Sequence, residues 1–171
     1  MNDGLTTLLG LLVAAWYLSH QAGRLDRLHQ RLDLTWDALQ ASMLARAELA
    51  RDVAARIQGP ASAEVVRCAT AVLRLGSNAA PQDVASAQNA LTRALGSLVQ
   101  DADSLTHLER AGSRDRLAHA CRRVALSRRF HADAVTACQL VRRQLLVRWL
   151  RLAGHAAPPF TLDFDDEVPG L

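Results

Sequence analysis

The sequence contains no lysine, few aromatic residues and no closely spaced cysteines. All twenty Lys or Arg positions are arginines, and aromatic residues make up 4% of the 171 residues. Strands favour β-branched and aromatic residues, whereas the abundant Ala, Leu and Arg favour helices. The three cysteines, Cys68, Cys121 and Cys138, show neither CxxC spacing nor a disulfide framework, which suits a reducing compartment. The composition therefore predicts an all-α protein with small buried thiols.

The residue patterns of common enzymes are also missing. There is no Gly-rich phosphate loop, no Gly-x-Ser-x-Gly elbow and no pair of histidines spaced to bind zinc. His131 and Cys138 would share a helix face, but two turns separate them by roughly 10 Å, too far for one ion. We therefore expect a protein that is not an enzyme, with no cofactor, no metal and no small-molecule substrate.

The longest uncharged run lies near the N-terminus. Residues 4–23 carry no charge, and a helix of that length covers about 30 Å, the thickness of a bilayer core. A basic n-region and a small-residue cleavage site are absent, so the pattern favours an uncleaved transmembrane anchor at residues 1–23 over a signal peptide. The side chains expected to contact lipid are Leu5, Leu8, Leu9, Leu11, Leu12, Val13, Trp16, Tyr17 and Leu18.

The charges beside this run predict its direction. Arg24, Arg27 and Arg31 follow it, and only the terminal amine is basic on the other side. By the positive-inside rule, the chain is a single-pass protein of the cell membrane, its N-terminus outside and its C-terminal domain cytoplasmic. Gly10 and Ala14 form a small-xxx-small pair that would let anchors pack together as a homo-oligomer.

Residues 24–155 read as a bundle of helices. Apolar residues recur every three or four positions up to Ile57, and Gly59 and Pro60 then end this first soluble helix. Short loops require neighbouring helices to be antiparallel, so we predict a four-helix antiparallel bundle with long first and last helices. The other helices are expected from Ser62 to the turn at Gly76, from Pro81 through Leu108, and from about 114 to 153. Residues 156–171, acidic and containing Pro158 and Pro159, are predicted to be a loosely packed or disordered tail.

Three polar residues fall on or beside the predicted core stripes. Arg46 belongs to the first soluble helix, and Arg128 and His131 belong to the last. Two buried arginines need counter-charges, and Glu48 and Asp133 are the expected partners. Two interpretations remain open: a polar layer that fixes helix register, or a site for binding a partner.

Basic residues also gather near the end of the last helix. Residues 110–151 hold eleven arginines against Asp115 and Asp133, and an antiparallel bundle would bring the end of this helix back to the membrane surface. It would either contact anionic lipid or simply close the core with Leu145, Trp149 and Leu152. The candidate surface contacts are Arg142, Arg143, Arg148, Trp149 and Arg151.

Two stretches and the chain's end resemble the LemA family. The first is Trp36-Asp37-Ala38-Leu39 followed by Met43, Arg46, Glu48 and Leu49, and the second is RRFHADAV at residues 128–135. The ending, Ala153-Gly154-His155 with Pro158 and Phe160, is also similar to the family's close. The resemblance implies a membrane-anchored antiparallel helical bundle without known catalysis.

These patterns together predict a non-enzymatic scaffold or adaptor. Its partners would be the lipid bilayer and a cytoplasmic protein that the sequence does not identify. The alternative is a module that binds an anionic surface, lipid or nucleic acid, through the arginines of the last helix. The scarcity of aromatic residues argues against single-stranded nucleic acid as a partner.

Overall fold

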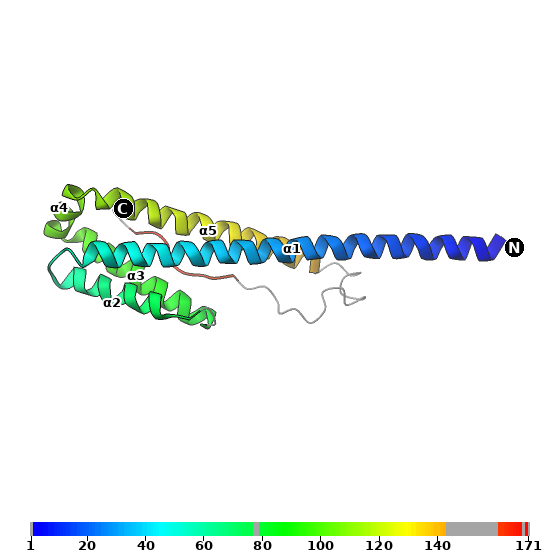
Figure 1. Cartoon of the computed structure of the whole chain (residues 1–171), viewed down its shortest axis with the longest axis horizontal. Coiled ribbons are helices and arrows are strands. Elements are labelled where there is room, and N and C mark those ends of the chain that lie inside the picture. The colour runs from blue at the N-terminus through cyan, green and yellow to red at the C-terminus, as the bar shows by residue number, and fades with distance from the viewer. Residues whose placement is uncertain (1, 77–78, 143–160, 169, 171) are drawn as a thin grey trace. The chain divides into compact units, whose positions relative to one another are not determined.

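Every regular element of the described chain is a helix (Figure 1). The structure is a computed structural model and describes residues 2–76, 79–142, 161–168 and 170. The helices are α1 (Asn2–Ala54), α2 (Pro60–Arg74), α3 (Pro81–Gln100), α4 (Ala102–Arg110) and α5 (Ser113–Arg142). No strand occurs within these ranges, so the predicted all-α fold class is confirmed.

The chain divides into two units. One consists of residues 1–35 and 133–160, and the other of residues 36–132 and 161–171. The first and last helices therefore each contribute to both units. In the first unit, the described part of α5 buries Ala134, Val135, Cys138 and Val141. The second unit holds most of the hydrophobic core and the described C-terminal residues.

Helix ends follow the Gly and Pro signals of the sequence, with one exception. Gly59 has a φ of 139°, a conformation that glycine adopts readily. Pro60 is the first residue of α2, a position at which a backbone N–H would make no hydrogen bond within the helix. The predicted helix from Pro81 through Leu108 is wrong in its extent, because it divides at Asp101. The Asp101 carboxylate accepts a hydrogen bond from the Ser104 N–H at 3.0 Å and so starts α4 as a second helix.

The core of the second unit is built from all five helices. Most of its residues are Ala, Val and Leu, which pack closely, and apart from Leu39 of α1 the largest fully buried apolar side chains come from α3, α4 and α5. Leucine→alanine changes at such positions cost about 2–5 kcal/mol of the free energy of unfolding. These core positions are Leu91, Leu95, Leu98, Leu108 and Leu117.

The N-terminal part of α1 exposes apolar side chains. The helix passes through positions 23 and 24 without a break. Leu8, Leu9, Leu12, Trp16 and Tyr17 are exposed, while the side chains of Leu5, Leu11, Val13 and Leu18 lie outside those the structure describes. Within the described ranges, none of the helices reaches the length and apolarity needed to cross a bilayer.

The predicted loosely packed tail is wrong for residues 161–168. This stretch is extended, and every second residue along it is buried. We call residues 161–168 together with Gly170 the C-terminal segment. It belongs to the same unit as α2, α3, α4 and the adjoining parts of α1 and α5.

Candidate functional site

The C-terminal segment alternates between buried and exposed positions. In an extended chain, successive side chains point to opposite sides, so alternate residues can share one face. The buried face carries three apolar residues and one carboxylate: Leu162, Phe164, Asp166 and Val168. Thr161, Asp163, Asp165 and Glu167 are exposed. The segment therefore has the burial pattern of a strand although no sheet pairs with it in the described structure.

Two of the buried residues extend the core. Leu162 and Phe164 pack in one apolar cluster with Leu39 and Met43 of α1 and Val124 of α5. Burying a Leu or Phe side chain stabilises a fold by roughly 1.5–3 kcal/mol. These two side chains thus provide a substantial apolar contribution to holding the segment.

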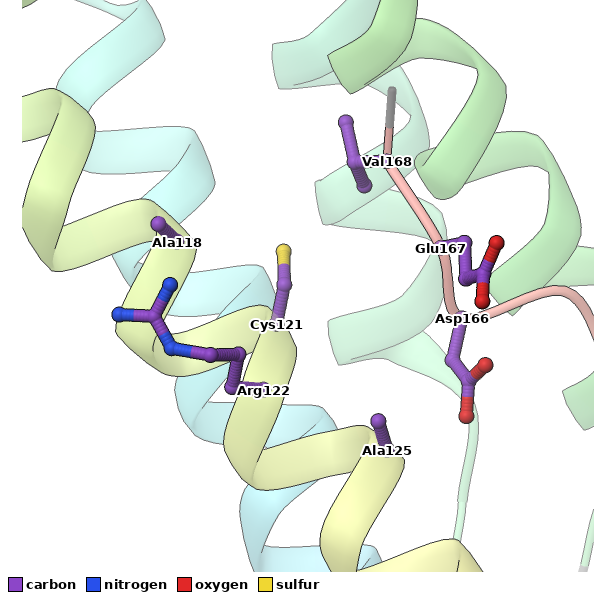
Figure 2. A pocket seen from close by; sticks show the side chains of 7 residues that line it. All are labelled: Ala118, Cys121, Arg122, Ala125, Asp166, Glu167 and Val168. Atoms are coloured by element: carbon purple, nitrogen blue, oxygen red, sulfur yellow. The ribbon is translucent and has the colours of Figure 1, made fainter. Parts of the chain in front are cut away.

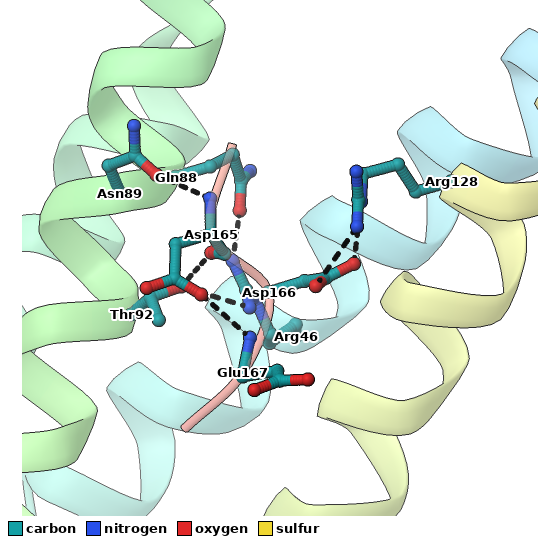
Figure 3. Close-up of polar contacts among 8 residues, drawn as sticks. All are labelled: Arg46, Gln88, Asn89, Thr92, Arg128, Asp165, Asp166 and Glu167. Carbon is teal, nitrogen blue, oxygen red and sulfur yellow. Dashed lines mark hydrogen bonds and ion pairs between the residues drawn. The ribbon is translucent and has the colours of Figure 1, made fainter. Parts of the chain in front are cut away.

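Side chains of α3 bind the backbone of the segment (Figure 3). The Asp165 N–H donates to the Asn89 side-chain oxygen at 2.7 Å, and the Asp165 carbonyl accepts from the Thr92 hydroxyl at 2.9 Å. The Asp165 carboxylate accepts from the Glu167 N–H at 3.1 Å, which fixes the next peptide unit. Side chains of α3 therefore bind both the N–H and the carbonyl of Asp165, and neither bond involves the Asp165 side chain.

Arg128 of α5 holds the buried carboxylate. Its Nε and a terminal nitrogen donate to the two oxygens of Asp166 at 2.6 Å and 3.3 Å, a bidentate geometry. The Asp166 side chain is 8% exposed, and its hydrogen bond raises the pKa of Arg128 above the ordinary value. The Arg128 guanidinium also lies 5.8 Å from the centre of the Phe164 ring, within range of a cation–π contact.

Arg46 of α1 is fully buried beside these groups. It donates to the Gln88 side-chain oxygen and, at 3.3 Å, to the Thr92 hydroxyl. Its Nε has no hydrogen-bond partner among the described residues. Burial lowers the pKa of Arg46, and the nearby Cys121 and Asp166 act against that shift. Asp166 is therefore the carboxylate that supplies negative charge to two arginines, one of them without access to water.

The segment runs in the same direction as α3. Asp165 meets Asn89 near the middle of that helix, whereas Gly170 lies against Val99 near its end. Five residues of extended chain cover about 16 Å and ten residues of helix about 15 Å, so the segment from Asp165 to Gly170 matches the length of α3 from Asn89 to Val99. At its far end, Arg114 of α5 donates to the Gly170 carbonyl at 3.0 Å.

The final turn of the segment requires glycine. Gly170 has a φ of 91°, and a Cβ added there would lie 3.0 Å from a methyl group of Val99. We predict that Gly170→Ala lowers the free energy of unfolding by about 1 kcal/mol, because both backbone strain and crowding oppose the methyl group. Urea denaturation checks this, with exposed Gly76→Ala as the matched control, since nothing lies within 4 Å of a Cβ at Gly76. Equal effects of the two changes would contradict it.

Small side chains on α5 make room for the segment (Figure 2). Ala118, Cys121 and Ala125 recur at intervals of three and four and so share a helix face. With Asp166 and Val168 they line an open cavity of about 410 Å³. Burial raises the pKa of the Cys121 thiol, and Arg46 opposes that rise. Cys121 is therefore a buried thiol next to the segment.

The structure brings only part of the predicted polar layer together. Arg46 and Arg128 both lie near Asp166, but Glu48 and Asp133, the partners expected from the sequence, are exposed. Those expected pairings are wrong, because Arg128 pairs instead with Asp166 of the C-terminal segment. His131 is buried, and its ring centre lies 5.4 Å from that of Trp36.

The predicted membrane-surface contacts are not part of the described structure. Arg143, Arg148, Trp149 and Arg151 lie outside the described residues, as does the side chain of Arg142 at the end of α5. Their contact with lipid therefore stays a prediction. Within the described ranges, no three His, Cys, Asp or Glu residues come close enough together to hold a metal ion.

Sequence reasoning missed four residues of this site: Gln88, Asn89, Thr92 and Asp166. The available signal was the alternation Leu162-x-Phe164-x-Asp166-x-Val168, which has the two-residue period of an extended chain. A comparison with protein-family models, curated proteins and solved structures finds no match to this chain. The resemblance to the LemA family thus rests on the sequence motifs alone.

Proposed function

We propose that this protein is a non-enzymatic scaffold or adaptor that the N-terminal part of α1 attaches to a membrane. The observation that carries the proposal is the exposure of Leu8, Leu9, Leu12 and Trp16 on one continuous stretch of helix. Contiguous exposed apolar surface marks a contact with another apolar body. The uncharged run 4–23 and the arginines that follow it favour a bilayer as that body. The LemA resemblance is consistent with this role and remains a prediction.

Sedimentation of the intact protein with vesicles tests the attachment. We expect the wild type to sediment with neutral phosphatidylcholine vesicles at both low and high salt, because apolar contact is insensitive to screening. Leu8→Gln, Leu9→Gln and Leu12→Gln together should reduce the bound fraction at least about tenfold, since each buried leucine contributes roughly 1.5–3 kcal/mol. Leu34→Gln is the matched control, because Leu34 is 70% exposed on the same helix beyond the uncharged run.

The same assay separates this proposal from the alternative, a module that binds anionic surfaces through the arginines of the last helix. Such a module would ignore neutral vesicles and bind vesicles containing phosphatidylserine, with an affinity that falls steeply as salt rises. Wild-type protein that remains in the supernatant with neutral vesicles would overturn attachment through α1.

A further inference from the structure

We propose that the face of α1, α3 and α5 now covered by the C-terminal segment is a binding site for an extended, acidic segment of a partner protein. The chain's own segment occupies this site and must leave before the partner can bind. We call the covered face the segment site. Asn89, Thr92 and Arg128 bind the segment there, Arg46 lies near Asp166, and Cys121 lines the cavity beside the segment.

The first argument is the way the site binds backbone. Asn89 and Thr92 bind the N–H and the carbonyl of Asp165, groups that every residue except proline carries. Neither bond depends on which side chain the bound residue carries, so this pair of side chains favours any extended peptide. Peptide-recognition sites combine such main-chain bonds, which give affinity, with pockets for alternate side chains, which give specificity.

The second argument concerns the side chains that the site selects. Apolar residues occupy the first, second and fourth buried positions, Leu162, Phe164 and Val168, and a carboxylate occupies the third. The fully buried Arg46 and the partly buried Arg128 favour a carboxylate at that third position, because a buried guanidinium without a counter-charge is costly. The partner segment should therefore follow the pattern apolar-x-aromatic-x-Asp-x-apolar.

The third argument is the charge beside the site. Arg93 of α3 lies in a cavity with Asp163 and Asp165, and Arg122 of α5 lies in the cavity with Asp166 and Glu167. Exposed acidic residues of an occupant thus share a cavity with an arginine of α3 and another with an arginine of α5. Electrostatic complementarity of this kind gives specificity and speeds association more than it adds affinity. A partner with acidic residues at the exposed positions fits better than a neutral one.

The chain's own segment limits access for any partner. A segment joined to the same chain competes at an effective concentration on the order of millimolar, so an equally well fitting free peptide binds the wild type weakly. Release of the segment is therefore the step that opens the site. Loss of Phe164 or of the Asp166 charge should favour release without touching the segment site itself.

Cys121 reports whether the segment site is covered. The thiol is 6% exposed and lines the cavity beside Asp166 and Val168. We expect its alkylation by N-ethylmaleimide, followed by peptide mass mapping, to be at least about tenfold faster in Phe164→Ala and in Asp166→Asn than in the wild type. Cys68, 3% exposed on α2, serves as the internal control for global unfolding. Thr161→Ala, at an exposed position of the same segment, is the matched control variant and should leave the Cys121 rate unchanged.

Addition of a synthetic peptide of residues 161–171 to the Phe164→Ala and Asp166→Asn proteins then tests binding. We expect the peptide to return the Cys121 rate to the wild-type value, and labelled peptide to bind either variant at least about tenfold more tightly than it binds the wild type. Peptides that carry the Phe164→Ala or Asp166→Asn change should protect Cys121 at least about tenfold less well.

Three results would overturn the proposal. The first is a variant in which Cys121 is alkylated fast and Cys68 slowly, but the peptide does not slow the alkylation of Cys121. This result would show that the segment site does not bind a separate peptide. The second is an unchanged Cys121 rate in both variants, which would show that the segment does not cover the thiol. The third is protection in the wild type that rises with protein concentration, because a second copy of the chain would then be the occupant.

Discussion

Asp166→Ala should lower the free energy of unfolding by about 3 kcal/mol. The change removes the carboxylate that pairs with Arg128 at 2.6 Å and that lies near the fully buried Arg46. Removal of this carboxylate leaves the fully buried Arg46 without a nearby counter-charge and the partly buried Arg128 unpaired, which costs more than the pair itself contributes. Urea denaturation followed by circular dichroism measures the loss.

Two further variants identify the cause of that loss. Asp163→Ala changes an exposed acidic residue of the same segment and should alter stability by no more than about 0.5 kcal/mol. Combining Asp166→Ala with Arg128→Ala should lose less than the sum of the two single changes, with a coupling energy of about 1–3 kcal/mol. Strict additivity of the single changes would argue against the ion pair.

Arg46→Ala is expected to be comparably damaging, with a loss of about 3 kcal/mol. It leaves a cavity at a fully buried position and removes the N–H groups that donate to the Gln88 and Thr92 side-chain oxygens. Arg46→Met refills most of the volume and removes a buried charge, so its loss should be smaller, about 1–2 kcal/mol. The same denaturation experiment compares them.

The matched control for Arg46 lies on the same helix. Arg51 is exposed and pairs with its neighbour Asp52, and exposed pairs contribute little, so Arg51→Ala should cost no more than about 0.5 kcal/mol. If Arg46→Ala proved as mild as Arg51→Ala, Arg46 would not be a buried residue of the core.

Local signals in the sequence were sufficient to predict most of the helices. The backbone restrictions of Gly59, Pro60 and Pro81 act locally. The helix boundaries at these residues can therefore be predicted without knowledge of the fold. Asp101 was missed because an aspartate is a cap only when its carboxylate reaches an N–H, here that of Ser104. Apolar periodicity alone continues through this break.

The candidate site depended on a contact that the sequence does not reveal locally. Arg46 and Arg128 were identified as residues needing a counter-charge, but Asp166 lies 38 positions after Arg128 and 120 after Arg46 in the sequence. The acidic, proline-containing end of the chain suggested a solvated tail. Its two-residue apolar alternation indicated an extended chain with one buried face, and the surface that buries it comes from three different helices.

Amide hydrogen exchange at Asp165 tests the central claim, that the C-terminal segment lies bound to its own helices, most directly. The Asp165 N–H donates to Asn89, so we expect it to exchange on the order of 100-fold more slowly than the same amide in the free 161–171 peptide. In Asp166→Ala the protection should fall sharply. Exchange in the wild type at the rate of the free peptide would contradict the account.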